Sequence, residues 1–180
     1  MSYLTTLDFL KGLKEYIECE VCEKIKLQSE NLTETEYVNP YCCVMHLPNA
    51  NFTPKNFVVP FISIELDSAS DDVDGHTLDI RITVATFGGG YYKNNEELNT
   101  IIPDGDGYID LINCIELIKQ ALLKNYTIGG NGTINKPIDY GTYDVDAPYP
   151  YWYGYLKFTA DIPNNEYTIK EESEELDYGI

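Results

Sequence analysis

Cysteine and histidine are the residues in this sequence that could hold a transition metal. Cys19 and Cys22 form a C-x-x-C pair. Either Cys42 or Cys43, together with His46, could complete a zinc site of three thiolates and one imidazole. Against zinc, the first pair falls within an expected helix, and the second half lacks a repeated C-x-x-C. We therefore interpret the cysteines as buried small apolar residues with free thiols, and expect no bound metal.

A second set of metal ligands is conceivable in the range Asp104–Asp110, where acids and a glycine resemble the middle of a calcium-binding EF-hand loop. The first ligand position would be Ile102 and the last Asn113, so the first acid and the bidentate glutamate are both missing. The simpler interpretation is a turn and a helix start, with Asp104 and Asp106 accepting backbone N–H bonds. A metal-binding module stays as an alternative function, which metal analysis would test.

Catalytic chemistry has few candidates in this sequence. His46 lies near prolines and His76 lies in an acidic turn, and neither stands beside a nucleophile motif. The triple glycine Gly88–Gly90 lacks the Lys-Ser/Thr of a phosphate-binding loop. We expect no catalytic residues, no cofactor and no enzymatic activity.

An aromatic run near the C-terminal end is the feature most suited to binding a protein partner, because Tyr and Trp bury large areas at little entropic cost. On a strand, its three odd-numbered tyrosines from 151 to 155 would share one face. Trp152 would join Leu156 and Phe158 only if a bulge near Gly154 shifted the register. Ordinary packing in the core and on the sheet is the competing interpretation. The candidate partner interface consists of Tyr149, Tyr151, Trp152, Tyr153 and Tyr155.

Two amphipathic helices are predicted to support these residues. The clearer one spans Gly107–Asn125, where apolar residues recur at three- and four-residue steps. The other spans Thr5–Gln28, and Thr5 with Asp8 resembles a capping box. Their predicted apolar stripes are Ile109, Leu111, Ile112, Ile115, Ile118 and Leu122 in the clearer helix, and Leu7, Leu10, Leu13, Ile17, Val21 and Ile25 in the other.

Three β-rich runs predict the sheet on which the helices pack. They are Phe57–Leu66, Thr77–Phe87 and Tyr151–Ile162, and the acidic turn Asp67–Gly75 predicts an antiparallel hairpin between the first two. A short run, Tyr41–Leu47, could be an edge strand or the inner side of a loop. Surface loops are predicted over Gly88–Asp106 and Gly129–Pro150, because Gly, Asn, Pro and Asp interrupt both segments.

These elements predict an α+β fold, a mostly antiparallel β-sheet with two amphipathic helices packed on one face. With 180 residues, the chain is expected to form one domain over residues 1–163, followed by an acidic C-terminal tail over residues 164–180.

The net charge of -18, from 12 basic and 30 acidic residues, argues against specific nucleic-acid binding, because phosphate recognition needs clustered Lys and Arg. The same charge opposes binding to an anionic membrane, and no stretch has the length and apolarity of a spanning helix. The N-terminal residues lack the apolar core of a secretion signal, so we expect the protein to stay inside the cell that makes it.

Taken in order, four segments of the chain resemble the tail terminator (collar) proteins of bacteriophages and prophages, a family also found in contractile phage-tail-like particles. The resemblance covers roughly residues 57–163, and it departs from the family in the cysteine-containing segment 29–56, in a longer loop and in the acidic tail. The segments are FVVPFISIEL, TLDIRITVATFG, GYIDLINCIELIKQALL and APYPYWYGYLKFTADIP.

This resemblance implies a structural protein: a small subunit with a β-sheet and helices on one side, assembled as a homo-oligomeric, hexameric ring on the head-proximal end of a tail. Such a ring stops polymerisation of the tail tube protein, caps the sheath in contractile tails and offers a docking surface to neck or connector proteins. It implies a place in the virion or tail-like particle, assembled in the bacterial cytoplasm. A head-tail connector or neck protein is the close alternative. An acidic lumen would let DNA slide through without sticking.

Overall fold

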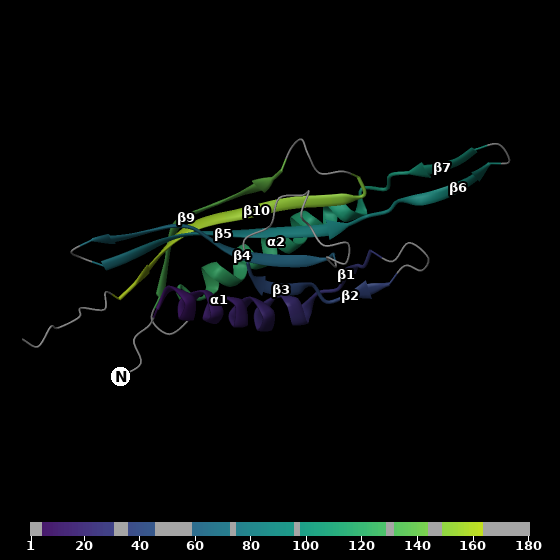
Figure 1. The fold of residues 1–180 in the computed structure, drawn as a ribbon. Helices are drawn as coiled ribbons and strands as arrows, with labels where there is room; N and C mark the ends of the chain where they lie inside the picture. The colour runs from purple at the N-terminus through teal and green to yellow at the C-terminus, as the bar shows by residue number, and fades with distance from the viewer. Residues whose placement is uncertain are drawn as a thin grey trace, which may run out of the picture.

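The computed structural model describes residues 5–30, 36–45, 59–72, 75–95, 98–128, 132–143 and 149–163. A six-stranded sheet carries two α-helices, and two small two-stranded sheets accompany it (Figure 1). The helices are α1 (Thr6–Glu20), the short 3₁₀ helix η1 (Cys22–Lys24) and α2 (Asp106–Lys124). The strands are β1 (Leu27–Gln28), β2 (Tyr37–Val38), β3 (Tyr41–Val44), β4 (Phe61–Asp72), β5 (Gly75–Phe87), β6 (Tyr91–Asn95), β7 (Leu98–Ile102), β8 (Thr127–Ile128), β9 (Gly132–Thr142) and β10 (Tyr151–Ile162).

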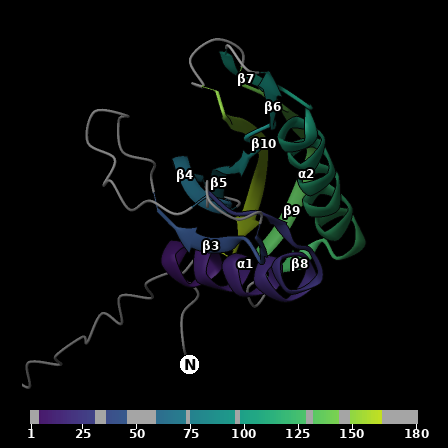
Figure 2. The same cartoon turned by 90° about the vertical axis from the view of Figure 1, so that its right-hand side faces the viewer.

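The main sheet has the strand order β3-β4-β5-β10-β9-β8. Its neighbouring strands are antiparallel except for β3 and β4, which run parallel. The sheet curls around its helices, so that α1 contacts β3 near one edge and β8 at the other (Figure 2). The predicted α+β fold, mostly antiparallel with both helices on one face, is confirmed.

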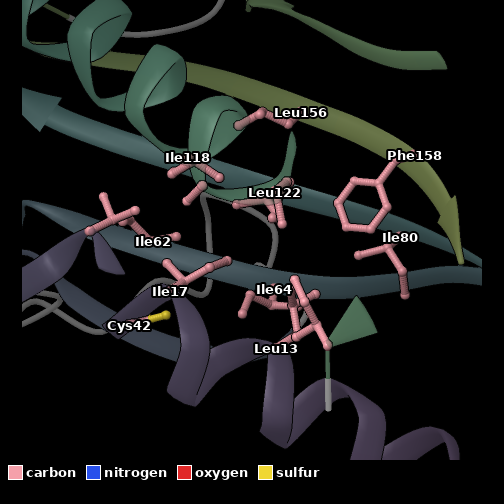
Figure 3. Packing of buried hydrophobic residues seen from close by; sticks show 14 of the residues in the cluster. Leu13, Ile17, Cys42, Ile62, Ile64, Ile80, Ile118, Leu122, Leu156 and Phe158 are labelled. Atoms are coloured by element: carbon pink, nitrogen blue, oxygen red, sulfur yellow. The ribbon is translucent and has the colours of Figure 1, made fainter. Parts of the chain in front are cut away.

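The main core lies between the curled sheet and both helices. Leu13 and Ile17 of α1 and Ile118 of α2 point toward the same central strands, and each is fully buried (Figure 3). Burial of a side chain of this size stabilises the fold by roughly 1.5–3 kcal/mol. Sheet residues that face the helices include Ile62, Ile64, Ile80, Ile82, Leu156 and Phe158.

Helix α1 begins as predicted but ends earlier. The Thr5 hydroxyl accepts the backbone N–H of Asp8, and the Asp8 carboxylate accepts the backbone N–H of Thr5, which is the predicted capping box. The helix ends at Glu20 rather than Gln28, because the chain tightens into η1 and then extends into β1. Leu7 is 52% exposed, so its predicted place in the apolar stripe is wrong, and Phe9 is buried instead.

Helix α2 also lies where the pattern predicts it, but fewer of its apolar residues face the core than the predicted stripe contains. Leu111, Ile115, Ile118 and Leu122 are buried, whereas Ile109 is 54% exposed and Ile112 is 36% exposed. These last two residues lie on the side away from the sheet, so their predicted burial is wrong. Two overlapping apolar stripes satisfy helical spacing here, and only one can face the core.

The start of α2 differs from the prediction in its N-cap. Gly105 occupies this position with φ 80°, a left-handed conformation that favours glycine. The carboxylate of Asp104 accepts a hydrogen bond from the backbone N–H of Asp106 at 3.1 Å. Asp104 therefore binds a free amide of the first turn as predicted, although it precedes the N-cap residue by one position.

Several segments predicted as turns or loops are strands. The hairpin of β4 and β5 is antiparallel as predicted, but its strands run through most of the predicted turn and pair Asp72 with Gly75. The predicted loop Gly88–Asp106 contains the two-stranded sheet of β6 and β7, and the predicted loop Gly129–Pro150 contains β9. In the short run Tyr41–Leu47, the range Tyr41–Val44 is the edge strand β3, and residues 46 and 47 lie outside the described residues. The acidic tail 164–180 lies outside the described residues.

Candidate interaction surface

Strand β10 carries the predicted aromatic run and lies inside the main sheet, between β5 and β9. Its register with β5 is continuous from Tyr151 to Ile162, so successive side chains alternate between the two faces. The register shift in this strand lies between Lys157 and Thr159, against β9. The expectation that Trp152 joins Leu156 and Phe158 only through a bulge near Gly154 is therefore wrong, because even-numbered residues of β10 share the helix-facing side without one.

Trp152 lies on this helix-facing side and packs against the main core. Its ring meets that of Tyr108 on α2 edge-on, with ring centroids 5.6 Å apart. A Cβ atom added at Gly107 would lie 2.6 Å from Trp152 Cδ1, so the indole fills the space that this glycine leaves. Trp152 thus joins helix α2 to the sheet and does not share a face with the neighbouring tyrosines.

Four tyrosines lie on the opposite face of the sheet: Tyr151, Tyr153 and Tyr155 of β10, and Tyr143, which follows β9. We call them the tyrosine face. The three β10 tyrosines are half-buried, and both α-helices lie on the other side of the sheet. The rings of Tyr143 and Tyr155 contact each other at a tilt of 46°, with centroids 5.2 Å apart. A second apolar cluster, separate from the main core, lies beneath this face and consists of Val59, Phe61, Ala85 and Phe87.

Edge-to-face contacts fix two of these tyrosines on that cluster. Tyr151 meets Phe87 at 5.7 Å and Tyr153 meets Phe61 at 6.5 Å between ring centroids. The hydroxyl of Tyr151 donates to the carboxylate of Glu30. Partial burial and this hydrogen bond raise the pKa of Tyr151 to about 12, and burial also raises the pKa of Tyr153. Both side chains therefore remain neutral hydrogen-bonding aromatics at physiological pH.

Charged residues continue the same sheet face beyond the tyrosines. Arg81 donates to the Asp67 carboxylate through Nη2 at 2.7 Å and Nε at 3.1 Å, and Lys157 Nζ lies 3.8 Å from the same carboxylate. The Lys157 ammonium also lies 5.7 Å from the centre of the Tyr155 ring. A hollow of about 290 Å³ lies beside them, bordered by Asp79, Asp139 and Thr159 among others.

Tyr149 lies apart from the tyrosine face, in the turn before β10, and is 44% exposed. A Cβ atom added at Gly90 would lie 2.7 Å from its hydroxyl, which puts Tyr149 at the base of the β6–β7 hairpin. The five predicted interface residues are therefore divided between three places: the tyrosine face, the core side of the sheet and the hairpin base.

The cysteines of the proposed zinc site are separated by burial. Cys19 is exposed, whereas Cys22 and Cys42 are buried and hydrogen-bonded to each other through their thiols. That bond and burial raise the pKa of Cys42, so Cys42 stays a thiol at neutral pH, whereas the same bond lowers the pKa of Cys22. His46 lies outside the described residues. Within the described ranges, no three His, Cys, Asp or Glu side chains gather to hold a metal ion.

His76 is not the solvated turn residue that the sequence suggested. It lies in β5 and is partly buried, its Nδ1 contacts the Asp71 carboxylate, and its Nε2 lies 3.1 Å from the Thr6 hydroxyl. The histidine therefore ties the β4–β5 hairpin to the first turn of α1.

Sequence reasoning missed three residues of the candidate surface. Arg81 was visible as a polar residue in the alternation of β5, but its partner Asp67 fell in a predicted turn. Tyr143 fell in a predicted loop, although its ring contacts that of Tyr155. A search for aromatic residues flanking the strand would have found it.

Neither α-helix in the described part of the chain is long and apolar enough to cross a membrane. No model of a known protein family matches the chain, and a search of curated proteins gives no significant match.

Proposed function

We propose that this protein is a structural tail terminator, a collar subunit that forms a hexameric ring on the head-proximal end of a phage tail or phage-tail-like particle. In this role it ends polymerisation of the tail tube, and of the sheath where the tail contracts, and it offers a docking surface to the neck. The motifs from Phe57 to Pro163 that resemble this family motivate the proposal.

The observation that carries the proposal is the tyrosine face on a sheet whose two α-helices cover only the other side. Half-buried tyrosines beside an apolar cluster offer large, rigid contact area, and Arg81, which donates twice to one carboxylate oxygen of Asp67, adds a polar margin together with Lys157. Interfaces between proteins combine these two parts, an aromatic centre and a charged rim. We assign this face to the contact with the tail tube protein.

The proposal is tested with purified protein and its cognate tail tube protein. The wild type is expected to bind the ends of assembled tubes and to stop their growth, seen by electron microscopy and by light scattering. Tyr155→Ala should weaken this binding by about 30-fold or more, as expected when an interfacial tyrosine is a binding hot spot. Tyr155 contacts Tyr143 rather than entering the core, so the variant should still fold.

Tyr37→Ala is the matched control, because Tyr37 is an exposed tyrosine on β2, outside the main sheet. It should bind tubes like the wild type. A wild-type protein that leaves tube growth unchanged would contradict the proposal. Binding to a connector or neck protein in place of the tube would assign the protein to the alternative position in the same assembly.

A further inference from the structure

Two buried thiols meet where the N-terminal helical region packs on the edge of the main sheet. Cys22 begins the short helix η1 and is 4% exposed, and Cys42 lies in the edge strand β3 and is 1% exposed. Their thiols are hydrogen-bonded to each other. Both residues belong to the main core, in which the Cys42 sulfur lies beside α1 (Figure 3). The fold thus brings together two sulfur atoms that are far apart in the sequence.

The backbone around both cysteines is already held in place by other contacts. The side-chain amide of Asn39, between β2 and β3, donates to the carbonyl oxygen of Cys22 at 2.6 Å and to that of Ile25 at 2.9 Å. Cys42 pairs with Ile62 in the parallel ladder between β3 and β4. A disulfide stabilises a fold when the native backbone presents both sulfur atoms without distortion. A covalent bond here would therefore add to contacts that the fold already makes.

The other three cysteines have different surroundings. Cys19 is exposed on α1, and Cys43 is partly exposed, with its thiol donating to a backbone carbonyl oxygen of β4 at 3.7 Å. Cys114 is buried on α2, within the main core. Among the five cysteines, all of which the structure describes, Cys22 and Cys42 are thus the two buried residues whose thiols share a hydrogen bond.

The hydrogen bond makes the two sulfur atoms chemically unequal. It lowers the pKa of the Cys22 thiol, whereas the same bond and burial raise the pKa of Cys42. The thiolate is the reactive form of cysteine, so Cys22 is the residue that an oxidant attacks first. Protein covers both side chains almost completely, so a small peroxide reaches the sulfur atoms more readily than a bulky disulfide such as oxidised glutathione does.

We propose that Cys22 and Cys42 form an oxidation-dependent lock, in which a peroxide converts the thiol pair into a disulfide that ties η1 to β3. The Cys22 sulfur first attacks one peroxide oxygen, the O–O bond breaks, and a sulfenic acid and one water form. The Cys42 sulfur then attacks the Cys22 sulfur, the S–O bond breaks, and the hydroxide leaves with the Cys42 proton as a second water. The two thiols are oxidised by two electrons in total, and the peroxide is reduced to two waters.

The lock would close a covalent loop from η1 to β3. Strand β3 is short and, within the described ranges, pairs only with β4, and peripheral segments with few partners are among the first to open locally. A bond from β3 to the helical region opposes this opening and also restricts the unfolded chain. The lock goes beyond the proposed function, because it holds whether or not the protein caps tail tubes.

The test uses the full chain with Cys19→Ser and Cys43→Ser, which keeps the buried pair and Cys114. The folded variant is treated with hydrogen peroxide, then denatured and alkylated. Mass spectrometry should find an alkyl group on Cys114 alone, and a disulfide that joins the tryptic peptides 15–24 and 27–55. The melting temperature should rise by about 5–10 °C, and dithiothreitol should reverse the rise. Peptide mapping of the oxidised wild type gives the same test without substitutions.

The matched control adds Cys42→Ala to the same variant, and circular dichroism verifies that it is folded. Peroxide should give this control neither the cross-linked peptides nor a reversible rise in melting temperature. The lock is overturned if the buried pair remains alkylatable after peroxide treatment, if Cys22 is oxidised to a sulfinic acid without a cross-link, or if Cys114 replaces Cys42 in the disulfide. A disulfide that forms only in urea would overturn it as well, because the folded state would then hold the sulfur atoms apart.

Discussion

Gly107 is the residue on which the packing of α2 against the sheet depends most closely. The Thr86 hydroxyl donates to its carbonyl oxygen at 2.6 Å, and a Cβ atom on Gly107 would lie 2.7 Å from the backbone nitrogen of Gly88. Trp152 covers the remaining side. Gly107 therefore lies where the first turn of α2, the residue after β5 and the indole meet, and no side chain larger than hydrogen fits there.

Replacing Gly107 with alanine should lower the free energy of unfolding by about 1–3 kcal/mol, because the added methyl group meets backbone that cannot move aside. In an unconstrained helix the same change would stabilise. The variant Asn113→Ala, at an exposed position of α2, should be neutral or slightly stabilising. Urea denaturation measures both; equal or greater stability of the Gly107 variant would mean that this contact is loose.

Residue-level prediction from the sequence was weakest where two assignments had the same spacing. Ile109 and Ile112 fit a helical stripe as well as Leu111 and Ile115 do, and only packing decides which stripe is buried. The side of Trp152 was also predicted wrongly, because simple alternation along a regular strand already puts residues 152, 156 and 158 on one face.

At the scale of elements, regular apolar periodicity identified α2, β5 and β10, and β10 has the predicted limits. Strand β9 was missed because its sequence, GTINKPIDYGT, contains Gly, Pro and charges that favour loops. A strand outside the centre of a sheet tolerates such residues, since it need not bury both faces. The hairpin of β6 and β7 was missed because Gly and Asn around it favour loops, and its two strands pair only with each other.

The N-terminus of α1 provides a test at this scale. Hydrogen bonds from the hydroxyl and backbone N–H of Thr5 lower the pKa of Asp8. A lowered carboxyl pKa stabilises the folded state above the unfolded pKa, and this stabilisation is lost as the pH falls through the folded pKa. The Thr5→Ala variant, which loses these hydrogen bonds, should therefore be less stable than the wild type at pH 7.

The same variant should differ less from the wild type at an acidic pH low enough to protonate Asp8 in both proteins than it does at pH 7. Urea denaturation at the two pH values measures the difference. Thr5→Ser keeps the hydroxyl and should match the wild type at both. A cost for Thr5→Ala that is independent of pH would show that the reciprocal bond from Asp8 contributes nothing to the cap.

For the whole molecule, the net charge of -18 opposes every contact between copies. The proposed ring requires such contacts, so screening of the overall repulsion should favour assembly. Raising the ionic strength from about 0.01 M to 0.1 M shortens the Debye length from roughly 30 Å to 10 Å.

Over that range of salt, the dissociation constant for self-association should fall by about tenfold, measured by sedimentation equilibrium. Sodium chloride and potassium chloride should act alike, because the effect is one of screening rather than of a specific ion. Tighter association at low salt would mean that complementary charges dominate the contact between copies.

The alternation along β10 has a consequence for how this protein can change over time. Its even positions hold the indole and the core, while its odd positions carry Tyr151, Tyr153 and Tyr155. On the proposed function, folding and recognition use alternate residues of this twelve-residue strand. The odd-numbered residues can then change along with a partner while the fold is kept. Insertion of a single residue, in contrast, would move each set of side chains to the other face of the sheet.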